Sequence, residues 1–223
     1  MPTIVFDLDG TLVDTAPDLV DTLNVILQRH GVAAVAFDDA RVMIGAGVKP
    51  LLARALASHG LQFPPAEIDR LFAEYLELYA AHIADRSRAF PGLEGALDAL
   101  AAQGHTLAVC TNKLEWLAVR LLDALKLAPR FAAICGQDTF PMRKPDPEML
   151  RLTIAKAGGD LAGAIMVGDS MTDVATAKAA RIPVIAVDFG YTETPPDQLG
   201  ADRLIGHFDA LPQAVREILA VSR

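Results

Sequence analysis

Five short apolar runs of strand type most strongly constrain how this chain can fold. The runs are continuous rather than alternating, which is typical of parallel strands covered by helices on both faces. Segments with helical periodicity separate them, so strand and helix alternate along most of the chain. The sequence therefore predicts an α/β fold with a doubly wound, Rossmann-like parallel sheet. The predicted strands are Thr3–Phe6, Thr106–Cys110, Ala132–Cys135, Ala164–Val167 and Pro183–Val187.

The helical segments follow the strands closely, and Gly104 is a plausible C-terminal stop for the first of them. A final helical segment closes the chain. The predicted helices of the core are Leu93–Gln103, Trp116–Lys126, Pro147–Ala157, Thr172–Ala180 and Leu211–Val221.

One region breaks this alternation, because a long stretch with no strand pattern separates the first predicted strand from the second. Three of its segments, 17–30, 48–57 and 67–84, have the apolar periodicity of helices. A wholly helical stretch between two strands indicates a second, smaller domain. We therefore predict an α/β core made of residues 1–14 and 88–223, with a helical insertion at 15–87. Its hinges are expected near residues 15–17 and 87–91.

Composition excludes several classes of protein. The chain of 223 residues is 52% hydrophobic and 22% charged, which suits a globular protein with a sizeable core. Its formal net charge of -8 argues against a broad basic surface for nucleic acid. We find no apolar run long enough to cross a membrane and no signal peptide, so we expect a cytoplasmic protein. Cys110 and Cys135 both close apolar runs and are predicted to be buried free thiols.

Two acids end the first predicted strand one residue apart. Alternation along a strand would point the side chains of Asp7 and Asp9 the same way. Two carboxylates on one face repel each other unless a metal ion or a proton lies between them. The electrostatic cost of this arrangement indicates a chemical role.

Polar side chains also follow the later strands. The carboxyl ends of the strands in an open parallel sheet are where ligands bind. The groups found there are four acids, two small polar donors and a lysine, which together suit a magnesium ion and a phosphoryl group. A carboxylate nucleophile could accept that group as an aspartyl phosphate. The residues are Asp7 and Asp9, then Thr111 and Asn112, then Lys144, and finally Asp169 and Asp173.

Each of these motifs has a structural reading when it is taken separately. A strand that ends in Asp-x-Asp can be a turn with Asx hydrogen bonds, and Thr111-Asn112 can be a helix N-cap. Lys144 can be a solvated loop lysine, and Gly168-Asp169-Ser170 can be a helix start. Their occurrence in order, at successive strand ends, favours the chemical interpretation.

The same motifs resemble those of the haloacid dehalogenase superfamily, over nearly the whole chain. They are Asp7-Leu8-Asp9-Gly10-Thr11, Thr111-Asn112, Lys144-Pro145-Asp146-Pro147, and Gly168-Asp169-Ser170 with Asp173. The helical insertion is similar to the C1 cap of that family. Within the superfamily the chain looks most like the bacterial phosphoglycolate phosphatases, on Thr111-Asn112-Lys113, Gly168–Asp173 and Val187–Tyr191.

The resemblance implies a role for each acid. Asp7 would be the nucleophile that becomes the aspartyl phosphate. Asp9 would protonate the leaving alkoxide and then activate water, which requires a tuned carboxyl pKa. Asp7, the backbone carbonyl of Asp9, Asp169 and Asp173 would form the magnesium site, with Asp173 orienting the metal's waters.

The remaining motifs would hold the substrate. By the same resemblance, Thr111 and Asn112 would bind the transferring phosphoryl group, and Lys144 would neutralise charge on it. The loop 44–49 of the insertion lies where related caps contact substrate. Gly45, Gly47 and Lys49 are therefore candidates for binding an anionic group, although this loop can also be read as merely flexible. Arg41 is a weaker candidate.

The resemblance implies magnesium-dependent hydrolysis of a small anionic phosphorylated metabolite, with 2-phosphoglycolate as the leading substrate, by a monomer or homodimer. A phosphatase for another small metabolite and a sugar-phosphate mutase of the β-phosphoglucomutase type remain alternatives. Thr11 argues against the mutase, since such enzymes often have Val there. A dehalogenase would require neither the carboxyl group of Asp9 nor the acids that are expected to bind the metal ion. A catalytically silent regulatory module would be expected to lack some of the motif residues. In this sequence every expected motif residue is present.

Overall fold

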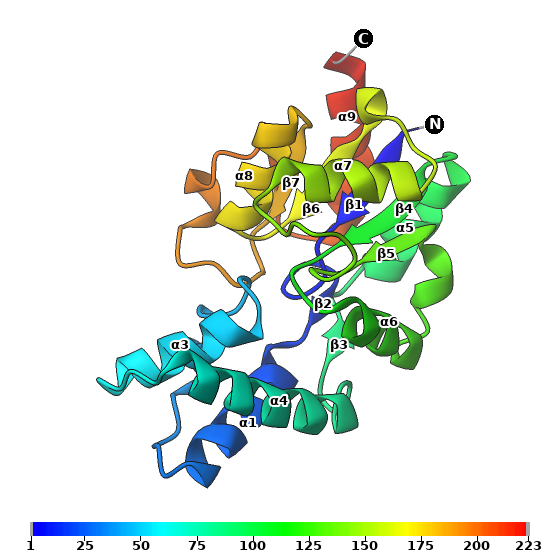
Figure 1. Ribbon diagram of the computed structural model, residues 1–223. Helices are drawn as coiled ribbons and strands as arrows, with labels where there is room; N and C mark the ends of the chain where they lie inside the picture. Colours follow the sequence, from blue (N-terminus) through cyan, green and yellow to red (C-terminus); the bar gives the residue numbers. More distant parts are fainter. Residues whose placement is uncertain (1, 222–223) are drawn as a thin grey trace.

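The computed structural model describes residues 2–221, in which a parallel six-stranded sheet lies between layers of helices (Figure 1). This architecture confirms the predicted doubly wound α/β fold. Residue 1 and residues 222–223, the extremes of the predicted core, lie outside the described residues. The strands of the sheet are β1 (Thr3–Phe6), β4 (Thr106–Cys110), β5 (Ala133–Cys135), β6 (Ile165–Gly168), β7 (Val184–Val187) and β8 (Arg203–Ile205).

The order of the strands places β1 at the topological switch point. The sheet runs β5-β4-β1-β6-β7-β8, so the chain moves outward to β5 on one side of β1 and then returns to its other side at β6. In such sheets the loops after the neighbouring strands diverge, which opens a crevice at their carboxyl ends. The loops that follow β1, β4 and β6 therefore meet in that crevice.

Helices cover both faces of the sheet, as the continuous apolar strands require. In β1 the side chains of Ile4 and Phe6 belong to one apolar cluster, and Val5 belongs to the other. The first cluster contains apolar residues of α5 (Leu93–Ala102), α6 (Glu115–Ala124) and α9 (Leu211–Val221). The second contains residues of α7 (Pro147–Lys156) and α8 (Met171–Ala180).

Two local features explain where predictions of these elements succeeded and failed. Gly104 follows the end of α5 with a φ of +82°, a left-handed conformation that favours glycine after a helix, so the predicted stop is correct. Strand β8 was not predicted. It lies at the sheet edge with two of its three residues exposed, so it lacks the apolar run that marked the other strands.

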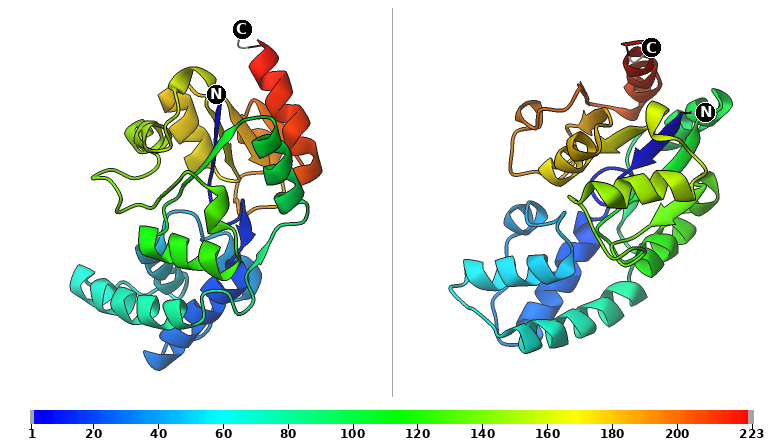
Figure 2. Two further views of the ribbon diagram at one scale, coloured as in Figure 1. Left: turned by 90° about the vertical axis from the view of Figure 1, so that its right-hand side faces the viewer. Right: turned by 45° about the horizontal axis from the view of Figure 1, so that its top comes forward.

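Four helices are inserted between the first two strands of the sheet: α1 (Ala16–Arg29), α2 (Phe37–Arg41), α3 (Val48–Ser58) and α4 (Pro65–Ala81). Both views in Figure 2 show these inserted helices as a separate layer beyond the carboxyl end of β1. Helix α1 packs on α4, where the Tyr75 hydroxyl donates a hydrogen bond of 2.9 Å to the Leu19 carbonyl. Helix α2 was not predicted because its five residues are too short to establish a period.

The two chain segments that connect the inserted helices to the sheet pair with each other. Strands β2 (Val13–Asp14) and β3 (Arg88–Ala89) form a short antiparallel ladder. The buried Asp18 carboxylate also accepts hydrogen bonds from the Arg86 N–H at 3.0 Å, the Ser87 N–H at 2.7 Å and the Ser87 hydroxyl at 2.6 Å. These hydrogen bonds therefore connect the start of α1 to residues 86–87, in the segment that leads from the inserted helices back to the sheet.

The cysteines are free and buried, as predicted. Burial raises the pKa of the Cys110 thiol to about 12. Among the described residues, no helix combines the length and the apolar character that crossing a membrane would require.

Candidate active site

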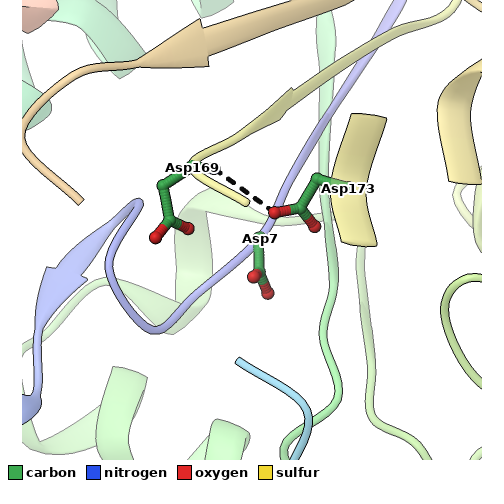
Figure 3. A group of neighbouring side chains, drawn as sticks. All are labelled: Asp7, Asp169 and Asp173. Carbon is green, nitrogen blue, oxygen red and sulfur yellow. Dashed lines mark hydrogen bonds between the residues drawn. The ribbon is translucent and has the colours of Figure 1, made fainter. Parts of the chain in front are cut away.

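Three buried aspartates from two strand ends face one another at the switch point. Asp7 directly follows β1, and its N–H donates to the Val167 carbonyl of β6 at 2.9 Å, which continues the sheet pairing by one residue. Asp169 follows β6, and Asp173 lies in the first turn of α8. One carboxylate oxygen of each lies within 4.8 Å of the others, and Figure 3 shows the three side chains converging.

Hydrogen bonds fix Asp173 at the start of α8. Ser170 and Asp173 form a capping box, in which each side chain accepts from the other's backbone N–H. The Asp173 Oδ2 atom accepts from the Ser170 hydroxyl at 2.6 Å and from the Asp169 N–H at 3.3 Å. Its Oδ1 atom accepts from Lys144 Nζ at 2.6 Å. Because both of its oxygens are already engaged, the position of Asp173 is set by the protein.

Asp169 is held from two other directions. Its Oδ1 accepts from the Thr11 hydroxyl at 2.8 Å, and its Oδ2 accepts from the Tyr191 N–H at 2.7 Å. The backbone at Gly190 approaches so closely that a Cβ there would lie 2.2 Å from the Asp169 Cβ. Glycine at position 190 therefore allows the loop after β7 to close over this carboxylate.

Lys144 supplies the positive charge inside the cluster. Its Nζ lies 2.9 Å from Asp7 Oδ1 and 2.6 Å from Asp173 Oδ1, and its side chain is only 1% exposed. Burial acts to lower the pKa of this lysine, but the two carboxylates outweigh burial and raise the pKa above its ordinary value. Lys144 therefore remains charged, as a buried bridge between the two acids.

One lysine does not balance three carboxylates. Burial raises the pKa of Asp7 to about 6, despite the opposing effect of Lys144. Burial, reinforced by Asp173 and Asp7, raises the pKa of Asp169 well above its usual range. A cluster of oxygen donors with unbalanced negative charge fits a hard divalent cation such as Mg²⁺.

Asp9 lies beside this cluster with partners of its own. Its Oδ1 accepts from the Thr15 hydroxyl at 2.8 Å and from Lys113 Nζ at 2.9 Å. The side chain of Asp9 does not belong to the group of three carboxylates, while both Asp7 and Asp9 line one cavity. The expected repulsion between them is present, because the charge of Asp9 contributes to the raised pKa of Asp7.

Thr111 and Asn112 follow β4 and reach the same place. The Thr111 N–H donates to the Cys135 carbonyl at 3.0 Å, which anchors the loop to β5. The Asn112 amide donates to the Lys144 carbonyl at 3.2 Å and makes a longer bond of 3.4 Å to the Gly45 carbonyl. Its buried carbonyl oxygen has no hydrogen-bond partner, so Asn112 retains an unused polar atom.

A narrow cavity of about 30 Å³ separates the strand ends from the inserted helices, with room for a couple of water molecules. It brings together six of the residues predicted from sequence: Asp7, Asp9, Thr111, Asn112, Gly45 and Gly47. The remaining wall is largely apolar and includes Leu19, Ile44, Phe72, Leu76, Tyr79 and Leu117. The site is thus charged on the sheet side and apolar on the helix side.

Lys49 and Arg41 do not line this cavity, contrary to the sequence-based expectation for this loop. The Lys49 ammonium pairs with Asp69 at 2.6 Å and lies over the Phe72 ring, and its side chain is about half exposed. Arg41 donates to the carbonyl of Phe189 at 3.0 Å. Lys49 is therefore held at the surface, whereas Arg41 contacts the loop after β7, whose Gly190 backbone packs against Asp169.

Sequence reasoning missed three polar residues of the cavity wall, Lys113, Tyr79 and Gln137. Lys113 was noted only as part of a motif, yet its buried ammonium contacts Asp9. Tyr79 lies in the segment 67–84, which was predicted to be helical with no role in the site, yet it lines the cavity together with Phe72 and Leu76. A helical apolar stripe gives no sign of whether it faces a core or a cavity, whereas the position of Lys113 directly after Asn112 was a usable signal.

Comparisons with known proteins show similarity over nearly the whole chain. The sequence model of the haloacid dehalogenase-like hydrolases matches residues 4–187. The chain is 48% identical to the phosphoglycolate phosphatase of Mesorhizobium japonicum, over 98% of this chain and 96% of the relative. It is 45% identical to the phosphoglycolate phosphatase of Caulobacter vibrioides, over 97% of this chain and 92% of the relative.

Solved structures give the same assignment. A "predicted phosphoglycolate phosphatase" from Haemophilus somnus superposes with a TM-score of 0.88 at 28% identity, covering 95% of this chain and 96% of the other. CbbY from Rhodobacter sphaeroides, solved in complex with phosphate, superposes with a TM-score of 0.79 at 25% identity, covering 94% and 95%. The chain therefore belongs to the haloacid dehalogenase-like hydrolases and is a phosphoric monoester hydrolase.

Proposed function

We propose that this enzyme hydrolyses 2-phosphoglycolate to glycolate and phosphate in a magnesium-dependent reaction, through an aspartyl phosphate on Asp7. One observation carries the proposal. Asp7 is the acid that belongs both to the buried carboxylate cluster and to the wall of the cavity. A nucleophile in that position can meet a substrate from one side and a metal ion from the other.

Asp7, Asp169 and Asp173 would hold the ion, joined by the backbone carbonyl of Asp9 that the family resemblance implies. When bound, Mg²⁺ supplies the positive charge that a phosphoryl group needs beside carboxylates. The hydrogen bonds already made by both oxygens of Asp173 support its role in orienting the metal's surroundings.

Asp7 is oriented for attack on phosphorus. The Leu8 N–H donates to its Oδ1 at 2.7 Å, and the ion pair with Lys144 is made through the same atom. Its Oδ2 is therefore the candidate attacking atom. Attack would form the bond between Oδ2 and phosphorus and break the bond between phosphorus and the substrate's ester oxygen. Water would then hydrolyse the aspartyl phosphate and release phosphate.

Asp9 would donate the proton that the leaving oxygen needs and later accept one from the hydrolytic water. Its contact with the Thr15 hydroxyl fixes it at the edge of the cavity beside Asp7. The Thr111 hydroxyl would bind a phosphoryl oxygen, and the Asn112 amide would exchange its longer bond to the Gly45 carbonyl for one to the phosphoryl group. Lys144 would offset the charge of that group. All three loops end at the switch point, which supports these roles.

The names of the relatives support the substrate assignment. The cavity of about 30 Å³ holds only a couple of water molecules, so binding of any phosphomonoester would require the inserted helices to move away from the strand ends. Two relatives at 45–48% identity over nearly the full chain are phosphoglycolate phosphatases by name. These names support 2-phosphoglycolate, a two-carbon phosphomonoester, as the substrate.

We further propose that residues 15–87 form a cap that moves relative to a catalytic core of residues 1–14 and 88–223. The paired linkers β2 and β3 are the natural hinge. Opening would admit substrate, and closure would exclude water from the first step. Gly45 and Gly47 would then approach the substrate from the cap, so bulkier residues there should impair turnover of phosphoglycolate more than that of an aryl phosphate.

The nucleophile assignment can be tested with Asp7→Asn. We expect this variant to fold normally and to lose phosphatase activity on every phosphomonoester, while wild-type protein in Mg²⁺ releases phosphate from 2-phosphoglycolate. Near-normal turnover by Asp7→Asn would overturn the mechanism. A screen of phosphorylated metabolites, with and without Mg²⁺ and ranked by kcat/KM, would test the substrate; any substrate with a higher kcat/KM than 2-phosphoglycolate would overturn that assignment.

A further inference from the structure

We propose that Lys113 selects the substrate by binding its carboxylate, and that it exchanges its ion pair with Asp9 for one with the substrate. This inference rests on the proposed function, because it names the group that recognises the non-reacting end of phosphoglycolate. It adds a specificity-determining residue that is distinct from those that handle the phosphoryl group.

The first argument is the placement of the ammonium group. Lys113 directly follows Asn112 and lines the cavity. Within residues 2–221, no other lysine or arginine lines this cavity. Its side chain is 4% exposed, and its Nζ lies 2.9 Å from Asp9 Oδ1 and 3.2 Å from Oδ2. A buried ammonium group requires an anionic partner, and Asp9 fills that need here.

The second argument is the wall that Lys113 packs against. Its Nζ lies 4.6 Å from the centroid of the Tyr79 ring, a cation–π contact with a residue of α4. The Tyr79 hydroxyl is buried and has no hydrogen-bond partner. Burial raises its pKa well above the ordinary value, so it stays protonated and able to donate. The residues that carry this cation and this unused donor therefore line the same cavity, Lys113 from the sheet side and Tyr79 from the inserted helices.

The chemistry of these two groups defines the ligand. An ammonium group and a hydroxyl beside an apolar wall favour a compact anion such as a carboxylate. Asp7 and Lys113 line the same narrow cavity, so the second anion must be only a few atoms from phosphorus. A phosphomonoester with a carboxylate one carbon away from its ester oxygen meets that requirement.

The exchange of partners would connect recognition to the reaction. A substrate carboxylate that binds Lys113 releases Asp9 from the ammonium group and leaves it with the Thr15 hydroxyl. A substrate without a carboxylate leaves the pair between Lys113 and Asp9 intact. Lys113 would therefore discriminate between substrates through the carboxylate itself.

The test compares Lys113→Met with wild type on two substrates, 2-phosphoglycolate and ethyl phosphate, in which a methyl group replaces the carboxylate. Loss of one partner of a buried charge pair predicts a fall in kcat/KM for phosphoglycolate at least about thirtyfold greater than the fall for ethyl phosphate. Lys113→Arg, which keeps a cation, should recover part of the preference. Lys156→Met, the same change at a half-exposed lysine of α7, is the matched control and should leave both rates unchanged.

Binding gives a readout that is independent of turnover. Titration calorimetry on Asp7→Asn and on Asp7→Asn/Lys113→Met should show weaker binding of phosphoglycolate in the double variant, with equal binding of inorganic phosphate. Thermal melts of both proteins check folding. Equal losses for phosphoglycolate and ethyl phosphate in Lys113→Met would overturn the inference and leave Lys113 as a positioning residue for Asp9.

Failure of the proposed substrate gives a different pattern. If wild-type enzyme prefers another carboxylated phosphate and Lys113→Met loses that preference, the substrate assignment fails and the role of Lys113 stands. If wild-type enzyme shows no preference for any carboxylated phosphate over the analogue that lacks the carboxylate, the role of Lys113 is overturned.

Discussion

Removing the positive charge of Lys144 should destabilise the metal-free protein strongly. The Nζ of Lys144 contacts Asp7 and Asp173 at 2.9 Å and 2.6 Å, and all three side chains are buried. Lys144→Met nearly keeps the volume of the side chain and removes the charge. The two carboxylates would then lie with Asp169 in a buried cluster without a cation.

The size of the effect follows from this burial. Breaking a buried ion pair by removing one partner costs about 3–5 kcal/mol, because the remaining charge is left uncompensated. In a chain of 223 residues, 1 kcal/mol corresponds to roughly 2–4 °C in melting temperature. We therefore expect Lys144→Met to melt roughly 6–20 °C below wild type in EDTA.

The measurement is thermal and urea unfolding in EDTA, repeated with excess Mg²⁺. Mg²⁺ should stabilise Lys144→Met more than wild type, because the ion replaces the missing positive charge as it binds the folded state. Lys156→Met removes a half-exposed lysine of α7 and is the control for the substitution itself. A loss below about 1 kcal/mol in Lys144→Met would refute the reasoning, since the cluster would then not depend on this cation.

Three further predictions concern the same structure. Because the folded pKa of Asp7, about 6, exceeds the ordinary value of 3.8, the folded protein in EDTA holds more protons between these values. Its free energy of unfolding should therefore fall by roughly 3 kcal/mol as the pH rises from 4 to above 6, which urea titrations at each pH would test. Cys110 and Cys135 should react with a thiol reagent only after unfolding, since burial raises both thiol pKa values; rapid labelling of native protein would contradict this. Asp18→Ala should lower the free energy of unfolding by about 2–4 kcal/mol and speed hydrogen exchange at the Arg86 and Ser87 amides, because it leaves buried donors unpaired; unchanged exchange would contradict the proposed fastening of the linker.

The sequence predicted the parts of the fold in which local pattern and burial coincide. Continuous apolar runs such as Thr3–Phe6 and Thr106–Cys110 became central strands because both of their faces are covered. The edge strand β8 has mostly exposed side chains, and its pairing comes from β7 rather than from its own composition. The pairing of such an edge strand depends on the neighbouring strand, and the local sequence pattern carries no information about that neighbour.

The same distinction holds in the site. The positions of Asp7, Thr111 and Asp169 after apolar strands were enough to predict that they converge, because parallel strands bring their carboxyl ends to one edge. The misjudged residues belong to the inserted helices or face them. Lys49 has a charge suited to an anion, but its surface partner Asp69 holds it outside the cavity.

The sequence by itself determined the chemistry of this protein, because acids, polar donors and a lysine follow successive strands and topology brings them together. Only the tertiary structure decided how those groups share their contacts. Lys144 bridges Asp7 and Asp173 inside the cluster, whereas Asp9 pairs with Lys113 beside Tyr79 of a helix far away in sequence. The physical reason is that a buried charge takes the nearest opposite charge in space, and that neighbour is set by how the loops after β1, β4, β5 and β6 meet at the switch point.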